Sequence, residues 1–270
     1  MRRIKRKKLK TKIIDTIWMK QSKNSKRFIE IDLLRGFAII LMVFGHILWD
    51  LDYFNIVPIN NIVYSTLQKI VPTLFFLLVG ISIAIVYSKY YSKKEKIDVV
   101  NKKLIIRGLK IFNLGVILTI FSLIFLPTRP IIFGVLHCIG FSIVLSVLFL
   151  RYRIANLFIG LSFIILGLFI SNIAISNPSI FHLIIGLRQP NIWMYTVDYF
   201  PLLPWFGVTL VGVGLGNIMY DGDKRCFKFP DLTKYRPAKI CSWIGRHSLE
   251  IYLIHQPVLA GFMYLFIRSF

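Results

Sequence analysis

Two segments of this chain are long, apolar and entirely free of charge. Ile154–Ile175 and Tyr199–Tyr220 contain no Asp, Glu, Lys or Arg, and each is close to the roughly 20 residues that a helix needs to cross a bilayer. A helix that is hydrophobic on every side has no face to present to water, so it lies in a membrane or deep inside a large core. These segments predict membrane-spanning helices.

Five further stretches meet the same test of length and low charge. Together, the candidate spans are Leu33–Leu51, Ile62–Tyr87, Leu104–Leu126, Ile131–Leu150, Ile154–Ile175, Tyr199–Tyr220 and Trp243–Ile267. Hydrophobic residues make up 56% of the chain and charged residues 17%, against about 45–50% and about 25% in soluble domains. We therefore expect an all-α fold, a polytopic transmembrane helix bundle of about seven spans in the cell membrane. The composition excludes a soluble enzyme and a disordered chain.

The basic residues are distributed unevenly between the segments that join these spans. The chain has 34 Lys and Arg against 12 Asp and Glu, for a formal net charge of +22. Twenty-nine basic residues lie in the N-terminal arm and in alternate connections, and three lie in the remaining connections. Because connections rich in Lys and Arg stay in the cytoplasm, the N-terminus is predicted inside and the C-terminus outside. Islands of charge between apolar runs also argue against a nucleic-acid partner, which needs a basic patch on a polar surface.

The start of the chain differs in composition from the rest. Residues 1–27 are predicted to be a basic cytoplasmic N-terminal arm, and residues 28–270 a transmembrane domain. A short basic helix in the arm would suit an anionic leaflet, with an apolar stripe made of Ile13, Ile14, Ile17 and Trp18. A topogenic tail without fixed structure explains the same composition, and both interpretations stay open.

Ionisable side chains inside the first span need an explanation, because each costs about 2.5–3.5 kcal/mol at the centre of a membrane helix. Arg35 and His46 are eleven residues apart, a spacing that returns to the same helix face roughly 16 Å further along the axis. Asp32 lies three residues before Arg35, and Asp50 lies four residues after His46. Each carboxylate can therefore reach its basic neighbour.

This pattern is typical of a reaction site. A histidine oriented by a carboxylate is a general base, so His46 and Asp50 are candidate catalytic residues. A guanidinium at the inner mouth can hold an anionic or phosphorylated donor, so Arg35 and Asp32 are candidate cofactor-binding residues. The alternative is that Arg35 and Asp32 mark the membrane edge and that His46 is a packed, hydrogen-bonded histidine. Spacing alone does not decide between the two.

Polar residues also follow one face of the last span. Ser248, Tyr252 and His255 fall at positions i, i+4 and i+7, so they share a stripe that could line a cavity or join helices through hydrogen bonds. His137 is an isolated histidine in the fourth span, and such a residue is more often packed than catalytic. The three cysteines show no metal-ligand spacing with one another or with histidine, and no metal site is predicted.

Four stretches of the chain share a pattern with a known group of membrane enzymes. The first is Arg-x-x-Glu-Ile-Asp-x-Leu-Arg-Gly-x-Ala-Ile-x-Leu-Met-Val-x-x-His over Arg27–His46, and the others are Ile132–His137, Asp198–Gly207 and Gly245–His255. In these stretches the chain resembles the transmembrane acyltransferase superfamily. Within it, the chain is most similar to bacterial and archaeal relatives of the heparan-α-glucosaminide N-acetyltransferase catalytic domain.

The resemblance implies transfer of an acetyl group from cytoplasmic acetyl-CoA to an acceptor on the far side of the membrane. It implies that His46 is the catalytic residue and that Arg35 serves the donor side. Further positions match the family's motifs and are expected to line the channel or acceptor site; they are His137, Asp198, Trp205, Tyr252 and His255. Ser248 shares the stripe of Tyr252 and His255. The outer connections are short, so the expected acceptor is a sugar of the cell envelope or one linked to the membrane, rather than heparan.

Two other functions are compatible with the same polar faces. A transporter or exporter of a glycan precursor would use them as a pathway, and would move substrate without consuming acetyl-CoA. A non-catalytic membrane scaffold would tolerate changes at His46. The enzyme alone predicts release of free CoA. The oligomeric state is not readable from the sequence.

Overall fold

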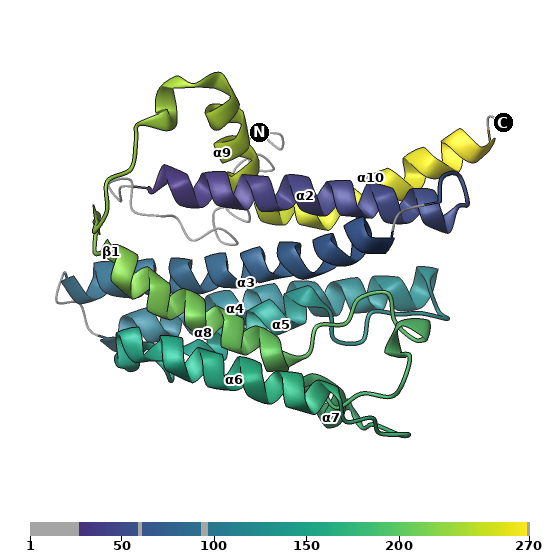
Figure 1. The fold of residues 1–270 in the computed structure, drawn as a ribbon, viewed down its shortest axis with the longest axis horizontal. Helices are drawn as coiled ribbons and strands as arrows, with labels where there is room; N and C mark the ends of the chain where they lie inside the picture. Colours follow the sequence, from purple (N-terminus) through teal and green to yellow (C-terminus); the bar gives the residue numbers. More distant parts are fainter. Residues whose placement is uncertain (1–26, 59–60, 93–96, 269–270) are drawn as a thin grey trace, which may run out of the picture.

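The structure is a computed structural model that describes residues 27–58, 61–92 and 97–268. The predicted basic arm lies outside the described residues except for Arg27. Most of the described part is helical (Figure 1). The helices are α2 (Ile29–Tyr53), α3 (Asn61–Ser92), α4 (Ile97–Phe125), α5 (Val135–Ser146), η1 (Leu150–Ala155), α6 (Asn156–Ser171), α7 (Ile180–Ile185), η2 (Ile192–Met194), α8 (Leu202–Met219), η3 (Leu232–Lys234), α9 (Arg236–Arg246) and α10 (Ser248–Arg268). The two short strands β1 (Tyr220–Asp221) and β2 (Lys224–Arg225) form an antiparallel hairpin.

Five helical segments are long and apolar enough to cross a membrane, namely α2, α3, α4, η1 together with α6, and α8. The prediction of a polytopic helical membrane protein is confirmed at this level. The predicted fourth span is the shorter apolar helix α5, which has 12 residues.

The predicted seventh span is divided into two helices. The backbone leaves the helical region at His247, with φ −101° and ψ 20°, so that α9 ends before it and α10 begins after it. The division has a physical reason. Helix α9 is amphipathic, with the basic side chains of Lys239 and Arg246 on one face and the apolar side chains of Ile240 and Ile244 on another, which suits an interface better than a bilayer core.

The bundle is organised around α8, which packs between α3 and α6, while α4 packs mainly on α5. Small residues allow the backbones to approach closely, as is usual for helices in membranes. Gly80 of α3 lies against the backbone of Thr209 in α8, and Gly207 of α8 lies against that of Gly160 in α6. A Cβ atom on any of these glycines would collide with backbone atoms.

Helices α2 and α10 run side by side along one edge of the bundle (Figure 1). Their arrangement is set by the crossing of α9 over α2. Gly245 of α9 meets the backbone of Asp32, and Gly36 of α2 meets the backbone of Cys241. Because α10 leaves this crossing in the same direction as α2, the polar stripe of α10 lies next to the polar face of α2.

An ion-pair cluster ties the start of α2 to the β-hairpin. Arg225 donates two hydrogen bonds to the carboxylate of Glu30, at 2.6 and 2.8 Å, and the hydroxyl of Tyr220 donates a third at 3.1 Å. The hairpin is also tied to α3, because Lys89 forms an ion pair with Asp223 at 2.9 Å. The cluster therefore fixes α2 to the rest of the bundle at one end.

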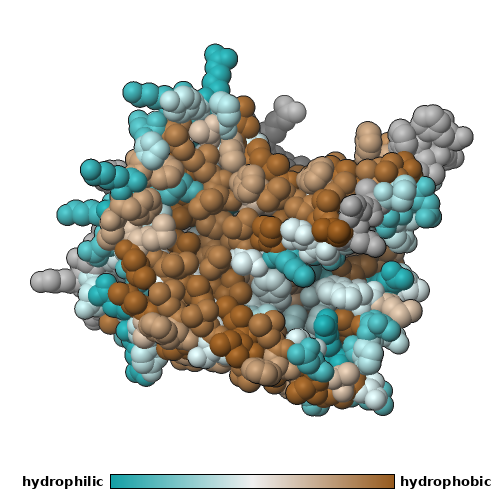
Figure 2. Space-filling model, in the orientation of Figure 1, coloured by the Kyte–Doolittle hydropathy of each residue, from teal (hydrophilic) through white to brown (hydrophobic). Residues whose placement is uncertain are grey.

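The surface agrees with a membrane environment. Figure 2 shows a broad hydrophobic band across this face of the molecule, with hydrophilic side chains concentrated toward its two ends. Large apolar side chains of α6 are highly exposed, including Phe158 at 71% and Phe169 at 69%. Soluble monomers rarely expose contiguous apolar patches of this kind, whereas lipid covers them in a bilayer.

Candidate active site

A cavity of about 1750 Å³ lies between α2, α3, α4, α5, α8 and α10. Most of the side chains singled out in the sequence line this cavity. They are Asp32, Arg35, His46, Asp198, Trp205, Ser248, Tyr252 and His255. Asp50 and His137 are not part of the lining. The fold therefore brings both predicted polar faces, from the first and the last span, into one space.

Arg35 occupies one end of the cavity and bridges two helices. Its guanidinium donates a hydrogen bond to the hydroxyl of Ser82 in α3, and its Nη1 atom lies 3.5 Å from the Oδ1 atom of Asp32. Ser82 in turn donates to the backbone carbonyl of Leu78 at 2.5 Å, so its oxygen is oriented to accept from Arg35. The planar fork of an arginine suits such a two-point contact. Sequence reasoning paired Arg35 with Asp32 but missed Ser82.

Other basic side chains line the cavity near Arg35, and we refer to this region as the basic end. They are Arg27, Lys89, Lys103, Arg107, Lys110 and Arg246. Lys103 donates a hydrogen bond to the hydroxyl of Tyr90 at 2.6 Å. Sequence reasoning did not single out Arg107 or Lys110 as part of a site. The sequence contains a pattern that predicts this cluster. Lys103, Arg107 and Lys110 are spaced at i, i+4 and i+7, which places all three on one helix face.

Two histidines meet at the other end of the polar face, which we refer to as the histidine end. The ring centroids of His46 in α2 and His255 in α10 are 4.7 Å apart, with an interplanar angle of 58°. The Nδ1 atom of His255 lies 2.7 Å from the carbonyl oxygen of Tyr252. A carbonyl only accepts, so Nδ1 carries the proton and Nε2 bears a lone pair. That Nε2 atom is buried and has no hydrogen-bond partner among the described residues.

The predicted orientation of His46 by Asp50 does not occur in this arrangement. The carboxylate of Asp50 accepts a hydrogen bond from the side-chain amide of Gln256 at 3.0 Å, and no hydrogen bond joins it to His46 within the described residues. Asp50 is only 2% exposed. The reason is tertiary, since α10 places Gln256 beside Asp50 and His255 beside His46. The partner of His46 is therefore an imidazole and not a carboxylate.

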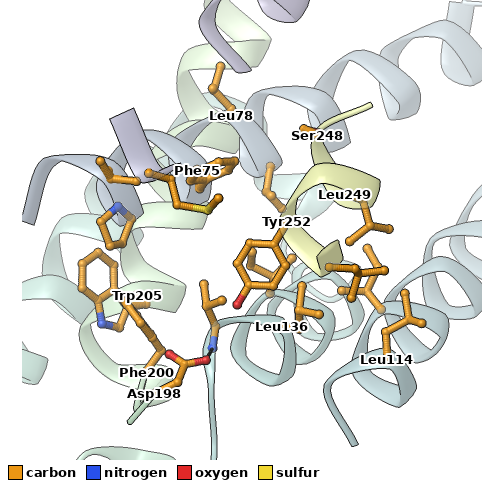
Figure 3. A pocket seen from close by; sticks show the side chains of 18 of the residues that line it. Phe75, Leu78, Leu114, Leu136, Asp198, Phe200, Trp205, Ser248, Leu249 and Tyr252 are labelled. Carbon is orange, nitrogen blue, oxygen red and sulfur yellow. Dashed lines mark hydrogen bonds between the residues drawn. The ribbon is translucent and has the colours of Figure 1, made fainter. Parts of the chain in front are cut away.

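Asp198 enters the cavity from the segment before α8. Its Oδ2 atom accepts a hydrogen bond from the backbone N–H of Val135 at 3.1 Å, at the start of α5. Burial raises the pKa of Asp198 to about 6, although the hydrogen bond from Val135 acts in the opposite direction. Figure 3 shows the hydroxyl of Tyr252 directed toward this carboxylate. Gly134 is needed beside it, because a Cβ atom there would collide with the Asp198 carboxylate.

Trp205 and Ser248 occupy different parts of the lining. The indole of Trp205 stacks on Phe76 with ring centroids 5.2 Å apart, and the ring of Phe200 lies 5.3 Å from it. Trp205 and Phe200 form an apolar wall of the cavity on the side of Asp198 (Figure 3), whereas Phe76 is fully buried and does not line the cavity. Ser248 lies at the first turn of α10, on the opposite side of Tyr252 from Asp198 (Figure 3).

His137 has a structural position between helices. Its Nδ1 atom accepts a hydrogen bond from the backbone N–H of Gly134 at 3.3 Å, next to the start of α5. The ring is 5% exposed and packs edge-on against Phe112 and face-on against Phe133. His137 is therefore a packed histidine, as isolated histidines in membrane helices often are. It does not line the cavity.

A known protein family matches most of the chain. The family described as heparan-alpha-glucosaminide N-acetyltransferase, catalytic, matches residues 27–257. The chain belongs to this family. The resemblance seen in the sequence is thereby confirmed, and the matched range contains every site residue discussed above. No curated protein and no solved structure matches the chain.

Membership of the heparan-α-glucosaminide N-acetyltransferase family identifies the chain as a membrane protein of acyltransferase type. Such a reaction needs a group that takes a proton from the acceptor and a place for an activated acyl donor. The histidine end contains the lone pair of His255, and the basic end carries several positive charges. Within the described residues, no group of three His, Cys, Asp or Glu side chains is placed to hold a metal ion.

Proposed function

We propose that this protein transfers an acetyl group from cytoplasmic acetyl-CoA to an extracytoplasmic sugar-type acceptor. The donor binds at the basic end of the cavity, the acceptor enters from the opposite side, and the two meet at His46 and His255. One observation supports this proposal above all others. A single cavity is lined by the basic cluster around Arg35 and by the histidine pair.

The charges support the assignment of the donor side. CoA carries several phosphate charges, and a cluster of Lys and Arg side chains with a guanidinium fork is the usual protein surface for such groups. The positive-inside rule favours a cytoplasmic location for the basic end, the side from which acetyl-CoA would enter. Arg35 and Asp32 then lie between the donor's phosphates and the reaction centre, and Arg35 is held by Ser82 and Asp32 rather than free to follow the donor.

The reaction follows from the two imidazoles. The hydroxyl or amine of the acceptor attacks the carbonyl carbon of the thioester, the C–S bond breaks, and CoA leaves as a thiolate. The proton of the acceptor passes to the imidazole pair and is then delivered to the thiolate. His255 is ready to accept it, because the carbonyl of Tyr252 holds the other ring nitrogen as a donor. In a double-displacement route His46 would first carry the acetyl group, and both routes use the same residues.

The proposed function is tested by release of free CoA from purified protein in nanodiscs that receive acetyl-CoA and an amino-sugar acceptor. We expect His46→Ala and His255→Ala each to lower the rate at least about a hundredfold, the usual contribution of a general base. His182→Ala is the matched control, since His182 lies at the first turn of α7 and outside the cavity lining. Wild-type turnover in folded His46→Ala protein would contradict the proposal.

The same assay separates the enzyme from a glycan exporter. An exporter would move the sugar across a liposome membrane without release of CoA, and the two histidine variants would affect flux alone. A non-catalytic scaffold would show neither release nor flux. CoA release that depends on acceptor and on both histidines distinguishes the enzyme from each alternative.

A further inference from the structure

The cavity has an apolar side that the reaction centre does not use. On α4 this side consists of residues spaced at i, i+4, i+7 and i+11, so they form one stripe along the helix; they are Leu114, Leu118, Phe121 and Phe125. On α10 a second stripe has similar spacing, with Leu249, Leu253, Pro257 and Ala260. We call the space between these two stripes the lateral groove.

The two stripes face the cavity and are not packed against each other. Helix α4 packs mainly on α5, and α10 packs mainly on α2. An apolar helix stripe is normally covered by a partner helix. Figure 3 shows Leu114 and Leu249 on the opposite side of Tyr252 from Trp205, so the groove leads away from the aromatic wall. From the histidine pair, the groove runs toward the gap between α4 and α10.

The outer part of the groove is open to the surroundings of the protein. Phe121 is 48% exposed and Phe125 is 63% exposed, although both line the cavity, and Ala260 is also exposed. The neighbouring surface is the hydrophobic face of a spanning helix, with Ile124 at 68% exposure. The groove is therefore continuous with the surface that lipid covers, and its opening lies in the plane of the membrane.

Position along α4 shows which half of the bilayer the opening faces. From Arg107 in the basic end to Phe121 at the opening is fourteen residues, or about 21 Å along a helix. The opening therefore lies in the half of the membrane away from the basic end. An occupant that enters there reaches the histidine pair from the side opposite to the donor phosphates.

We propose that the acceptor is an amphiphile, a sugar-type head group attached to a long aliphatic chain, and that its chain lies in the lateral groove. This inference rests on the proposed function and deepens it by naming the acceptor class. The head group sits at His46, His255 and Asp198, and the chain runs between the α4 and α10 stripes into the leaflet. Lipid chains are about as apolar as leucine, so the groove supplies little affinity. Its effect is to hold the head group at the reaction centre.

The first test measures binding without catalysis. A dodecyl β-glucosaminide with a diazirine at the end of its chain is irradiated with the protein in nanodiscs, and the labelled peptides are identified by mass spectrometry. Label within residues 114–125 or 249–260, displaced by excess unlabelled dodecyl glucosaminide, supports the proposal. Label confined to residues 156–166 of α6, which have exposed apolar side chains such as Phe158 but do not line the cavity, overturns it.

The second test compares methyl and dodecyl glucosaminides as acceptors. Partition into the bilayer raises the local concentration of the dodecyl compound for any membrane enzyme, so the informative quantity is the ratio of the two kcat/KM values in each variant. We expect Leu118→Trp to lower the dodecyl-to-methyl ratio about tenfold. The matched control Ile117→Trp adds the same bulk to the adjacent residue, which is 59% exposed and does not line the cavity, and should leave the ratio unchanged.

Ala260→Phe, at the exposed opening of the groove, provides a second blocking variant if Leu118→Trp does not fold. Equal ratios in both blocking variants and in wild type would overturn the amphiphile proposal while leaving acetyl transfer intact. If neither glucosaminide is acetylated but photolabelling still occurs in the groove, the result contradicts the proposed reaction and supports the site for the aliphatic chain. A preference that depends on the chain length of the acyl donor, and not of the acceptor, would assign the groove to the donor and also overturn the proposal.

Discussion

The backbone of α10 determines the chemical state of His255. The carbonyl of Tyr252 accepts from Nδ1 at 2.7 Å, so Nε2 carries a lone pair without help from a carboxylate, and that lone pair has no partner among the described residues. Asp50, the carboxylate expected to orient His46, accepts a hydrogen bond from Gln256 instead. A backbone carbonyl is a neutral acceptor, so it fixes a tautomer without stabilising the imidazolium as strongly as a carboxylate does. Such a histidine is suited to pass a proton on.

A second residue-scale consequence concerns Asp198. Burial raises the pKa of this carboxyl to about 6 in the folded protein, against about 3.9 in an unfolded chain. The folded state therefore binds the proton more tightly than the unfolded state, and stability decreases as pH rises from about 4 to about 6. The shift corresponds to at most about 3 kcal/mol.

Asp198→Asn should remove this pH dependence. The amide oxygen of asparagine can still accept from the N–H of Val135, so the contact at the start of α5 is kept while the titration is lost. We expect wild type to lose thermal stability between pH 4 and pH 6.5 relative to the variant, and the variant to be the more stable of the two above pH 6. Unfolding midpoints in detergent over this range measure the difference. Parallel pH curves for the two proteins would contradict the assignment.

At the scale of elements, the β-hairpin controls where α2 begins. Arg225 makes a two-point ion pair with Glu30, whose side chain is 7% exposed, and the guanidinium lies over the ring of Phe28 at 5.3 Å. The pair joins residues 195 positions apart in the chain. Because Arg35 and His46 lie on the same helix as Glu30, a shift of this end of α2 would move both ends of the site.

Arg225→Gln is expected to destabilise the protein by about 1.5–3 kcal/mol, since a mostly buried carboxylate loses its charge-assisted partner. The double variant Glu30→Gln with Arg225→Gln should recover part of this loss, because no unpaired charge then remains. Thermal unfolding of the single and double variants, with Arg151→Gln as an exposed control outside the cluster, measures the coupling. A double variant no more stable than Arg225→Gln would show that the pair is not the cause.

At the scale of the whole molecule, the distribution of charge and the hydrophobic band indicate the same membrane axis, which runs along the helix bundle from one end to the other. Except for Lys69 and Arg188, the basic residues of the cavity belong to the basic end around Arg35. The β-hairpin and α9 lie at one end of the bundle, and the turn after α2 lies at the other end (Figure 1). The proposed reaction requires this axis to cross the membrane with the basic end in the cytoplasm. Donor and acceptor then approach the histidine pair from opposite sides.

Cysteine labelling of intact cells tests the orientation. In a variant that lacks Cys138 and Cys241, the exposed native Cys226 reports on the basic end, and Asn55→Cys reports on the turn after α2. A membrane-impermeant maleimide should label residue 55 in intact cells and reach Cys226 only after the membrane is opened. The reverse result would place the basic end outside and contradict the assignment of the donor side.

Local sequence was enough to predict the helical membrane fold, and most of the site residues that it singled out line the cavity. Charge-free segments such as Tyr199–Tyr220 lead to spanning helices because the bilayer imposes length and apolarity on each segment separately. Likewise, the eleven-residue spacing of Arg35 and His46 places both on one face through helix geometry alone. Both residues line the cavity. These properties depend only on residues near one another in the chain.

The partners of the site residues depended on the tertiary structure. Helix spacing allowed His46 to reach Asp50, but the crossing of α9 over α2 at Gly36 and Gly245 brings α10 alongside, so His46 meets His255 and Asp50 meets Gln256. The same crossing divides the predicted last span at His247. Ser82 joined Arg35 from 47 residues away. Periodicity determines which face a side chain occupies, and only the packing of distant helices determines what that face meets.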